Sequence, residues 1–467
     1  MANICFIIFN QPSHYNATFA IARALEKKGH SITYLSHNES QKAYVEKQGF
    51  PLKRVFKDCY YKHEGQTVAD ENDYTRPFKI LKEVIAQTKQ LKNIFLEGIE
   101  IQQLIDREKP DLFIIDYSYV QYYFSLQKFD IPIVMLETTV SSVRTPKYPG
   151  VFSTLMPEDS TLGNLKISLS WKRYYLKRWM VNTWYKILFR GYDPSSFINL
   201  LIKQTGFPKN KIDRSRAFYV GIKGVKELVL CEKAFDFPGR NIPDQYHLCP
   251  IIDQQRTGAF TTVSKNKTIE VINTVEVLNS LENTQHIIYG SLGSSASLWF
   301  HDRTTFFKKL IDAVRNLDNC MLVLSVGKNF DQTSLGTIPS HVYIYERVPQ
   351  LEILKKTNLM VTHGGLNSVN ECIFNGVPML VDTLGLPYDQ NGNAARVAYH
   401  GMGLRANIRK EATTEVTKKI KHILNQSSFK ENILKMQEKY KNAQDAAKHA
   451  HIVEQFLEHT HTLIKTI

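Results

Sequence analysis

The feature that most constrains the fold is an alternation of short apolar runs with segments of helical spacing. At the N-terminus, the apolar run Cys5–Phe9 is followed by a polar loop over Gln11–Tyr15. In Ala17–Lys28, apolar residues recur at three- and four-residue steps. Gly29 follows as a left-handed helix cap, and Ser31–Leu35 is the next predicted strand. A strand, a helix and a second strand in so short a length predict parallel strands joined by a right-handed crossover.

The same alternation recurs along both halves of the chain. In the first half, Leu112–Ile115 and Pro132–Leu136 are predicted strands, and a helical stretch beginning at Tyr119 separates them. In the second half, helix-like segments separate five apolar runs: His286–Tyr289, Met321–Val326, Val342–Tyr345, Leu359–Thr362 and Pro378–Asp382. Two such series predict an α/β protein with two doubly wound domains.

The boundary between these domains is predicted near Cys249–Asn283. Prolines punctuate its approach, and Gly258–Lys267 is polar and rich in turn formers. The length of 467 residues suits two or three domains. We therefore predict one domain over residues 1–252, a second over residues 253–445, and a terminal helix over residues 446–467.

Composition and charge narrow the classes of protein. The chain has no run of about 18 apolar residues, so no membrane-spanning helix is expected. Its N-terminus is predicted to be a buried strand, since it lacks the basic region and cleavage site of a signal peptide. The six cysteines are scattered without a Cys-x-x-Cys pair, which disfavours disulfides and thiolate metal sites and favours the cytoplasm. The net charge of +14 favours an anionic partner, whether nucleotide, nucleic acid or acidic membrane.

Ile167–Arg190 has an unusual composition, with three tryptophans, three tyrosines, six Lys or Arg residues and no acidic residue. One hypothesis is an interfacial helix in peripheral contact with an anionic membrane, which would place the protein at the inner membrane surface. The other is an acceptor-side helix packed on its own domain. Several basic residues point around the helical wheel: Lys172, Lys177, Arg178 and Lys186. Because they do not collect on one face, the packed helix is favoured.

The strongest candidate site is a strand, a glycine turn and a helix in direct succession. The strand Leu359–Thr362 leads into His363–Gly365, a tight turn at which backbone can approach a ligand. Asn367 or Ser368 then starts a helix that runs to Phe374. A helix N-terminus offers unpaired N–H groups and about half a positive charge, so this element is suited to a diphosphate.

Side chains extend this candidate site. His363, Asn367 and Ser368 add hydrogen-bond donors at the helix start, and Glu371 lies one turn further along. A carboxylate in that place suits the two vicinal hydroxyls of a ribose. A His-Gly-Gly turn alone is a common structural element, but the Pro-Gln pair upstream and the Asp-Gln pair downstream favour a ligand site.

This segment resembles the donor-binding signature of the family 1 glycosyltransferases, the UDP-glycosyltransferases, and especially their bacterial macrolide- and carotenoid-glycosylating branch. The resemblance extends to Ser291–Ser294, which is similar to the first phosphate loop of that family's C-terminal domain, and to Val229–Pro250. Ser13–Ala20 resembles the family's Gly-His-x-x-Pro element. The likeness spans most of the chain and is patchy between Lys147 and Val225.

The resemblance implies a GT-B fold, in which two Rossmann-like domains face each other and the C-terminal helices pack back on the N-terminal domain. It implies an inverting enzyme that moves a hexose, glucose before others, from a UDP-sugar to a hydroxyl of a hydrophobic small molecule. Aromatic residues over Tyr117–Arg190 suit such an apolar acceptor. The residues implied in donor binding are Gly293, Ser294, Arg347, Val348, Gln350, His363, Gly365, Asn367, Ser368, Glu371, Asp389 and Gln390.

Each group has an implied role. Gly293 and Ser294 would approach the phosphates from the facing loop, and Val348 and Gln350 would lie beside the uracil. Glu371 would bind the ribose, while the Asp-Gln pair at 389 and 390 would hold sugar hydroxyls. The helix start and the histidine of the glycine turn would stabilise the leaving diphosphate, so no cofactor and no metal are expected.

The resemblance also implies a catalytic pair, with His14 as general base and Asp116 as the group that orients it. An imidazole can take the proton of an acceptor hydroxyl as the bond to the anomeric carbon forms. A buried carboxylate would fix the tautomer of the ring. Both residues follow predicted strands, where ligands bind in open α/β sheets. The alternatives are an exposed or structural histidine and a helix-capping aspartate.

The sequence departs from the family pattern at three positions. Arg347 stands where plant members have tryptophan, which leaves uracil or thymine undecided. Ala17 replaces the usual proline, and Leu366 follows Gly365 in place of tryptophan or methionine.

Two other functions compete with sugar transfer to a small molecule. They are a membrane-surface glycolipid synthase with the same donor chemistry and a nucleotide-sugar-binding protein without transfer activity. Nucleic-acid binding rests on charge alone, and no recognised motif supports it.

Overall fold

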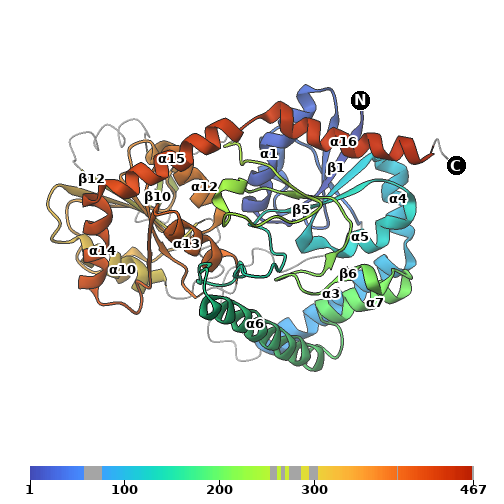
Figure 1. Ribbon diagram of the computed structural model, residues 1–467, viewed down its shortest axis with the longest axis horizontal. Coiled ribbons are helices and arrows are strands. Elements are labelled where there is room, and N and C mark those ends of the chain that lie inside the picture. Colours follow the sequence, from blue (N-terminus) through green and yellow to red (C-terminus); the bar gives the residue numbers. More distant parts are fainter. Residues whose placement is uncertain are drawn as a thin grey trace.

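The computed structural model describes residues 1–56, 76–252, 260–263, 269–272, 286–293, 303–385 and 388–464. Its described strands include two large parallel sheets, each flanked by helices, in two lobes that lie side by side (Figure 1). This confirms the two predicted Rossmann-like domains. In the described part of the chain, no helix combines the length and apolar character that crossing a membrane requires.

The N-terminal sheet has seven described strands in the order β3-β2-β1-β4-β5-β8-β9. Their bounds are β1 Asn3–Ile7, β2 Ser31–Ser36, β3 Leu52–Arg54, β4 Leu112–Asp116, β5 Ile133–Glu137, β8 Glu227–Val229 and β9 Gln245–His247. Neighbouring strands are parallel, and β1 pairs with β2 on one side and with β4 on the other. The strand order reverses between β1 and β4, where doubly wound sheets bind their ligands.

Helices cover this sheet and connect its strands. Their bounds are α1 Pro12–Lys27, α2 Lys42–Lys47, α3 Arg76–Glu97, α4 Ile99–Glu108, α5 Gln121–Leu126, α6 Thr161–Leu188 and α7 Pro194–Gln204. The prediction of a loop over Gln11–Tyr15 was wrong, because α1 already begins at Pro12. Proline suits this first helical position, where its missing N–H costs no hydrogen bond. His14 therefore lies in the first turn of α1.

The C-terminal sheet has six described strands in the order β14-β13-β12-β15-β16-β17, again with parallel neighbours. Their bounds are β12 His286–Ser291, β13 Cys320–Ser325, β14 Val342–Tyr345, β15 Leu359–Thr362, β16 Met379–Asp382 and β17 Gly403–Ala406. The five predicted strands are confirmed. The sixth, β17, was not predicted, since it is a short edge strand without a continuous apolar run. The described helices between these strands are α10 Arg303–Val314, α11 Gln350–Leu354, α12 Leu366–Asn375 and α13 Gln390–Tyr399, and α14 Thr413–Asn425 follows β17.

Smaller elements lie outside the two sheets. The strands β6 Ile212–Asp213 and β7 Gly221–Ile222 form one antiparallel pair, and β10 Phe260–Val263 and β11 Ile269–Ile272 form another.

Residues 253–259, at the predicted domain limit, lie outside the described residues, so the limits of the domains stay predictions. The five described cysteines are buried and free, while Cys59 lies outside the described part.

Two long helices follow α14, and the second of them agrees with the terminal helix predicted over residues 446–467. Helix α15 (Ser427–Ala443) packs on α12, and α16 (Ala446–Ile464) crosses to the N-terminal domain and lies on α1 (Figure 1). Ala450, Val453 and Phe456 of α16 are buried in the same apolar cluster as α1. The expectation that the C-terminal helix packs back on the first domain is confirmed.

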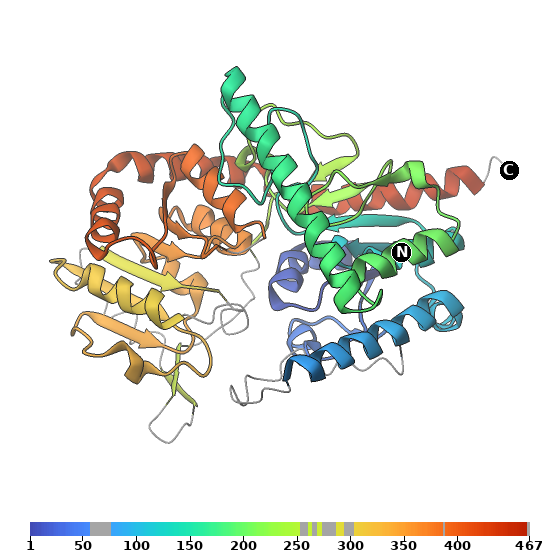
Figure 2. The same cartoon turned by 90° about the horizontal axis from the view of Figure 1, so that it is seen from below.

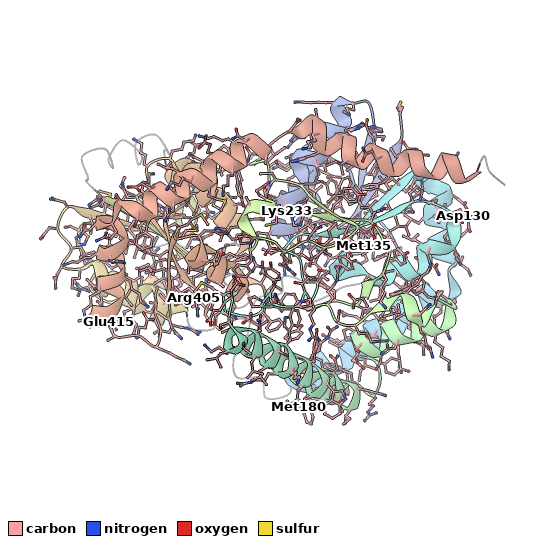
Figure 3. The ribbon with its side chains drawn as sticks, viewed as in Figure 1. Asp130, Met135, Met180, Lys233, Arg405 and Glu415 are labelled. Atoms are coloured by element: carbon pink, nitrogen blue, oxygen red, sulfur yellow. The ribbon has the colours of Figure 1, made fainter. Side chains whose placement is uncertain are left out.

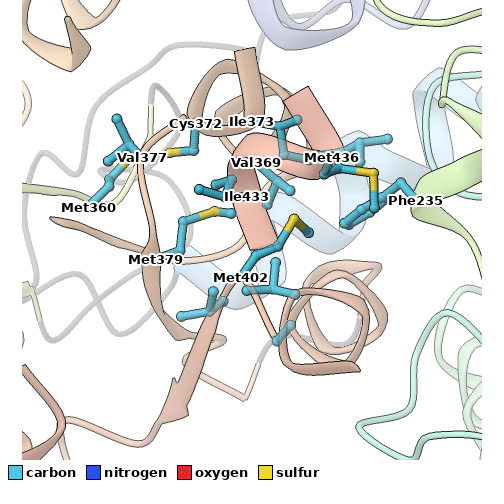
Figure 4. Packing of buried hydrophobic residues seen from close by; sticks show 14 of the residues in the cluster. Phe235, Met360, Val369, Cys372, Ile373, Val377, Met379, Met402, Ile433 and Met436 are labelled. Carbon is cyan, nitrogen blue, oxygen red and sulfur yellow. Dashed lines mark hydrogen bonds between the residues drawn. The ribbon is translucent and has the colours of Figure 1, made fainter. Parts of the chain in front are cut away.

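The two domains share a packed interface. Figure 4 shows Phe235 of the first domain directed toward Met436 and neighbouring apolar side chains of the second. Beside it, the buried Arg396 binds Asp236 at 2.6 Å, and Asp236 also binds Arg240 at 2.9 Å. Burial alone would raise the pKa of Asp236, but the two arginines outweigh it and hold the pKa below its usual range. This paired charge fixes one domain against the other.

Candidate active site between the domains

His14 and Asp116 meet where β1 and β4 end. The Nδ1 atom of His14 lies 2.6 Å from Oδ2 of Asp116 and 3.0 Å from the hydroxyl oxygen of Thr138. The Asp116 side chain is 2 % exposed, whereas 18 % of the His14 side chain remains accessible. Because the carboxylate accepts the proton on Nδ1, the neutral ring carries its lone pair on Nε2.

Asp116 also caps a helix, which was the alternative role considered for it. Its Oδ1 atom accepts a hydrogen bond of 2.8 Å from the backbone N–H of Ser118 and so caps the short helix Tyr117–Tyr119. One carboxylate oxygen holds the backbone and the other holds His14. The cap fixes the orientation of the carboxylate that faces the imidazole.

Three neighbours of this pair were not predicted. Thr138 follows β5, and the end of that predicted strand was the available signal. The ring of Phe9 packs edge-on against His14 with centroids 5.1 Å apart. Burial raises the pKa of Tyr219 above its usual range, and the charges of Asp116 and Asp389, one from each domain, raise it further. No local sequence pattern marks Tyr219, because its position depends on the packing of the two domains.

The strand–turn–helix element has the predicted form with one correction. Helix α12 starts at Leu366, with Gly365 as its N-cap, rather than at Asn367 or Ser368. Gly365 adopts the extended cap conformation and, as a glycine, gives the helix no side-chain cap. Gly364 has a φ of 84°, and a Cβ atom there would lie 2.7 Å from Val381. Only glycine fits this turn, which leads directly into a helix start whose N–H groups suit an anion.

His363 is enclosed by two glycine-containing loops of this domain. A Cβ atom on Gly293 or on Gly365 would lie 2.6 Å from its ring. Burial lowers the pKa of His363 to about 4, so at neutral pH the ring is a neutral N–H donor rather than a cation. Gly293 has the left-handed φ of 81° that suits glycine, and Ser294 lies outside the described residues.

Gln350 and Glu371 are joined directly. The Nε2 atom of Gln350 donates to Oε2 of Glu371 at 2.6 Å and to the hydroxyl of Ser368 at 3.3 Å. Tyr289 of β12 donates to the amide oxygen of Gln350 at 3.3 Å, which the sequence did not predict. The residues predicted for base and ribose thus form one network. Arg347 is exposed and Val348 is half-buried. Both precede Pro349, the N-cap of α11.

Asp389 is linked to this element through Asn393. Asn393, to which no role was assigned from sequence, donates to Asp389 at 2.9 Å and to the carbonyl of Gly364 at 2.9 Å. Burial raises the pKa of Asp389, and the charge of His14 is among the effects that lower it, so the two groups are within electrostatic reach. Gln390 begins α13 directly after Asp389.

Asn367 connects the two halves of the site. Its side-chain amide donates a hydrogen bond of 2.7 Å to the backbone carbonyl of Ser13, in the first turn of α1. The start of the donor helix therefore lies against the turn that carries the histidine of the catalytic pair. Among the predicted residues, Gln350, Ser368 and Glu371 thus form one network, Asp389 is linked to the glycine turn, and Asn367 reaches the first domain.

Comparison with known proteins agrees with this arrangement. Residues 276–444 match the family model described as "UDP-glucoronosyl and UDP-glucosyl transferase". The chain is 22 % identical to NDP-glycosyltransferase YjiC of Bacillus subtilis over 95 % of this chain and 94 % of that protein. It is 25 % identical to NDP-glycosyltransferase YjiC of Bacillus licheniformis over 96 % of this chain and 97 % of that protein.

A solved structure shares the fold along nearly the whole chain. The calicheamicin glycosyltransferase CalG4 superimposes with a TM-score of 0.64 at 16 % identity, covering 98 % of both chains. The family match over the donor-binding half and the full-length relatives agree with the GT-B arrangement of the two sheets. Residues 276–444 therefore carry the likeness to the UDP-glycosyltransferase family model, and the chain is an enzyme that transfers a sugar from a nucleotide-sugar donor.

Proposed function

We propose that the enzyme transfers a hexose, glucose before others, from a UDP-sugar to a hydroxyl group of a hydrophobic acceptor with inversion at the anomeric carbon. The observation that carries the proposal is the 2.6 Å contact between Nδ1 of His14 and Asp116, which leaves Nε2 as the basic atom of a partly accessible ring. A histidine oriented in this way is suited to general-base catalysis near neutral pH.

The chemistry follows as a single displacement. The acceptor oxygen attacks the anomeric carbon as its proton passes to Nε2 of His14, and the bond to the diphosphate breaks on the opposite face. Asp116 stabilises the imidazolium that forms, and its burial strengthens this interaction. Attack opposite to the leaving group inverts the configuration of the sugar.

The donor half supplies the groups that a departing diphosphate needs. The first N–H groups of α12 have no side-chain cap, and His363 is a neutral N–H donor beside them. Both stabilise negative charge where it develops in the transition state, so the mechanism calls for no cofactor. Glu371 is assigned to the ribose hydroxyls, and Gln350, bonded to it, to the adjoining base.

Asp389 and Gln390 are assigned to the sugar hydroxyls. The bonds from Asn393 hold the carboxylate of Asp389 against the glycine turn, so its position relative to the diphosphate site is fixed. On the acceptor side, aromatic rings line the approach to His14. Phe9 packs on His14, and Tyr119 packs on Phe9 with centroids 5.5 Å apart. Such a surface suits an apolar acceptor.

The test is the stereochemistry of transfer. The purified protein is given UDP-, TDP- and GDP-glucose with a library of hydrophobic alcohols and phenols, and the configuration of the product is read by proton NMR. We expect transfer from the UDP-sugar and a β-glucoside from the α-configured donor. An α-glucoside would rule out the single displacement with His14 as base.

A further inference from the structure

Helix α6 has a second apolar face that packs against nothing in the described structure. Its inner face is buried, with Ile167 at 3 % and Trp171 at 2 % exposure. Its outer face carries large apolar side chains whose exposed fractions range from 48 % to 68 %: Leu165, Leu169, Leu176, Trp179, Trp184 and Ile187. The helix lies at the lower edge of Figure 1 and, seen from below, crosses the front of the molecule (Figure 2). Met180 lies at the outer edge of the side-chain view (Figure 3).

The exposed apolar residues gather on one side of the helix, with the exposed Arg173 among them. From Leu162 onward they recur at steps of three, four, seven, four and seven residues through Leu165, Leu169, Leu176, Met180 and Ile187. This spacing places them on one side of a helix. Because α6 has 28 residues, the stripe extends along a helix of about 42 Å.

Basic residues border this stripe. Lys172, Lys177 and Lys186 are all exposed, and α6 contains no acidic residue. Arg178 is the exception to the exposed set, because it faces inward and donates to the carbonyl of Arg216 at 2.7 Å. Arg178 therefore adds nothing to the exposed charge of the helix, whereas the three lysines, spread around the wheel as the sequence indicated, lie on both sides of the stripe.

We propose that the outer face of α6 docks on an anionic lipid bilayer. Exposed tryptophan and aliphatic side chains suit the boundary of headgroups and acyl chains, and bordering lysines suit lipid phosphates. A second copy of this chain is a poor occupant. A twofold contact through this face would bring two basic rims together without an acidic residue of α6 to pair them.

The inner face of α6 connects the docking surface to the candidate active site. The hydroxyl of Tyr174 accepts a hydrogen bond of 2.7 Å from the N–H of Phe218, and Arg178 donates to the carbonyl of Tyr219 at 3.1 Å. Tyr219 lies within electrostatic reach of Asp116 and Asp389. Docking would therefore hold the catalytic pair close to the bilayer. Resting on the proposed function, this assigns the acceptor to amphiphiles that partition into the membrane and expose a hydroxyl at its surface.

The direct test is vesicle flotation of the full chain. We expect binding to vesicles of equal parts phosphatidylcholine and phosphatidylglycerol at low salt, release at high salt, and little binding to phosphatidylcholine alone. Lys172→Gln with Lys177→Gln should weaken partitioning about fivefold per residue. Leu176→Asn with Ile187→Asn should abolish detectable flotation. The proposal is overturned if wild type ignores the anionic vesicles or if both double variants float as wild type does.

A matched control and two further readouts separate the alternatives. Leu434→Asn with Lys435→Gln changes exposed residues of α15 in the same way and should leave flotation unchanged. Light scattering coupled to size exclusion tests for a second copy, and a dimer that Leu176→Asn with Ile187→Asn converts to monomers would overturn the proposal. Transfer to a freely soluble acceptor without vesicles should be equal in wild type and variants. Loss of that activity in wild type would count against the proposed function alone, because flotation does not depend on it.

Discussion

The side-chain amide of Asn367 donates a hydrogen bond of 2.7 Å to the backbone carbonyl oxygen of Ser13, across the interface of the two domains. Asn367 lies in the first turn of the donor helix, and Ser13 directly precedes the proposed base. The contact couples the position of the diphosphate site to that of the imidazole. Donor binding and base placement are therefore expected to depend on one another.

Asn367→Asp tests this coupling. The aspartate cannot donate to the Ser13 carbonyl, and its charge opposes a diphosphate at the helix start. We expect the donor KM to rise and kcat to fall, each by about two- to tenfold, the scale of one hydrogen bond. Steady-state kinetics with varied donor measures both. Asn432→Asp, which removes a similar side-chain contact to the Gly401 carbonyl, is the control and should behave as wild type.

His14→Ala should lower turnover by about 10²–10⁴-fold, the usual scale for a general base. Donor affinity measured by calorimetry should stay within experimental error of wild type, because no donor contact is assigned to this ring. His422→Ala, at an exposed histidine of α14, serves as the control. Wild-type turnover in the His14 variant would refute the assignment of the base.

The two functions of Asp116 can be separated by substitution. In Asp116→Asn, the amide oxygen can still accept from the Ser118 N–H, so stability should change little. Turnover should fall by about 10²–10⁴-fold, because the amide no longer stabilises the imidazolium. Asp116→Ala should lose the cap as well, at a cost of about 1 kcal/mol. Thermal unfolding beside single-turnover kinetics reads the two effects. Equal stability loss in both variants would contradict the division of roles.

Glu371→Gln should weaken donor binding more than it slows chemistry. The carboxylate accepts from Gln350 at 2.6 Å and is assigned to the ribose hydroxyls. Loss of a charged acceptor costs about 1.5–3 kcal/mol, so the donor Kd should rise roughly 10- to 100-fold. Calorimetric titration with UDP measures it directly. The matched control is Glu352→Gln, at a carboxylate of α11 whose partner is Lys355.

Stability should fall in acid partly through His37. Burial lowers the pKa of this 4 % exposed histidine to about 4, below its unfolded value. The unfolded state therefore binds the proton more readily, so the contribution is fully present above pH about 6.5 and is lost as pH falls toward 4. The loss is up to roughly 3 kcal/mol. Urea unfolding between these pH values should be less pH-dependent in His37→Gln than in wild type, and an unchanged slope would oppose the prediction.

Much of the fold follows from local sequence. Apolar runs and helical spacing predicted the β1–α1–β2 unit and the five strands of the second sheet, because periodicity reports which face of a segment is buried. The edge strand β17 and the start of α1 at Pro12 escaped this reasoning. In both places the local pattern is weak, so contacts with neighbouring segments decide whether a strand or a helix forms.

The donor half of the candidate site was accessible from sequence, since His363–Glu371 form one continuous strand–turn–helix element whose geometry is set by its own glycines. The catalytic pair is different. His14 and Asp116 are separated by 102 positions, and only the pairing of β1 with β4 brings them within 2.6 Å.

Tertiary structure alone decided three further features: the bond between Ser13 and Asn367, the electrostatic coupling of Tyr219 to Asp116 and Asp389, and the outward apolar stripe of α6. Sequence determines which residues are apolar, charged or able to bend. Which of those side chains meet, and which remain exposed, depends on contacts between distant segments that no local pattern encodes.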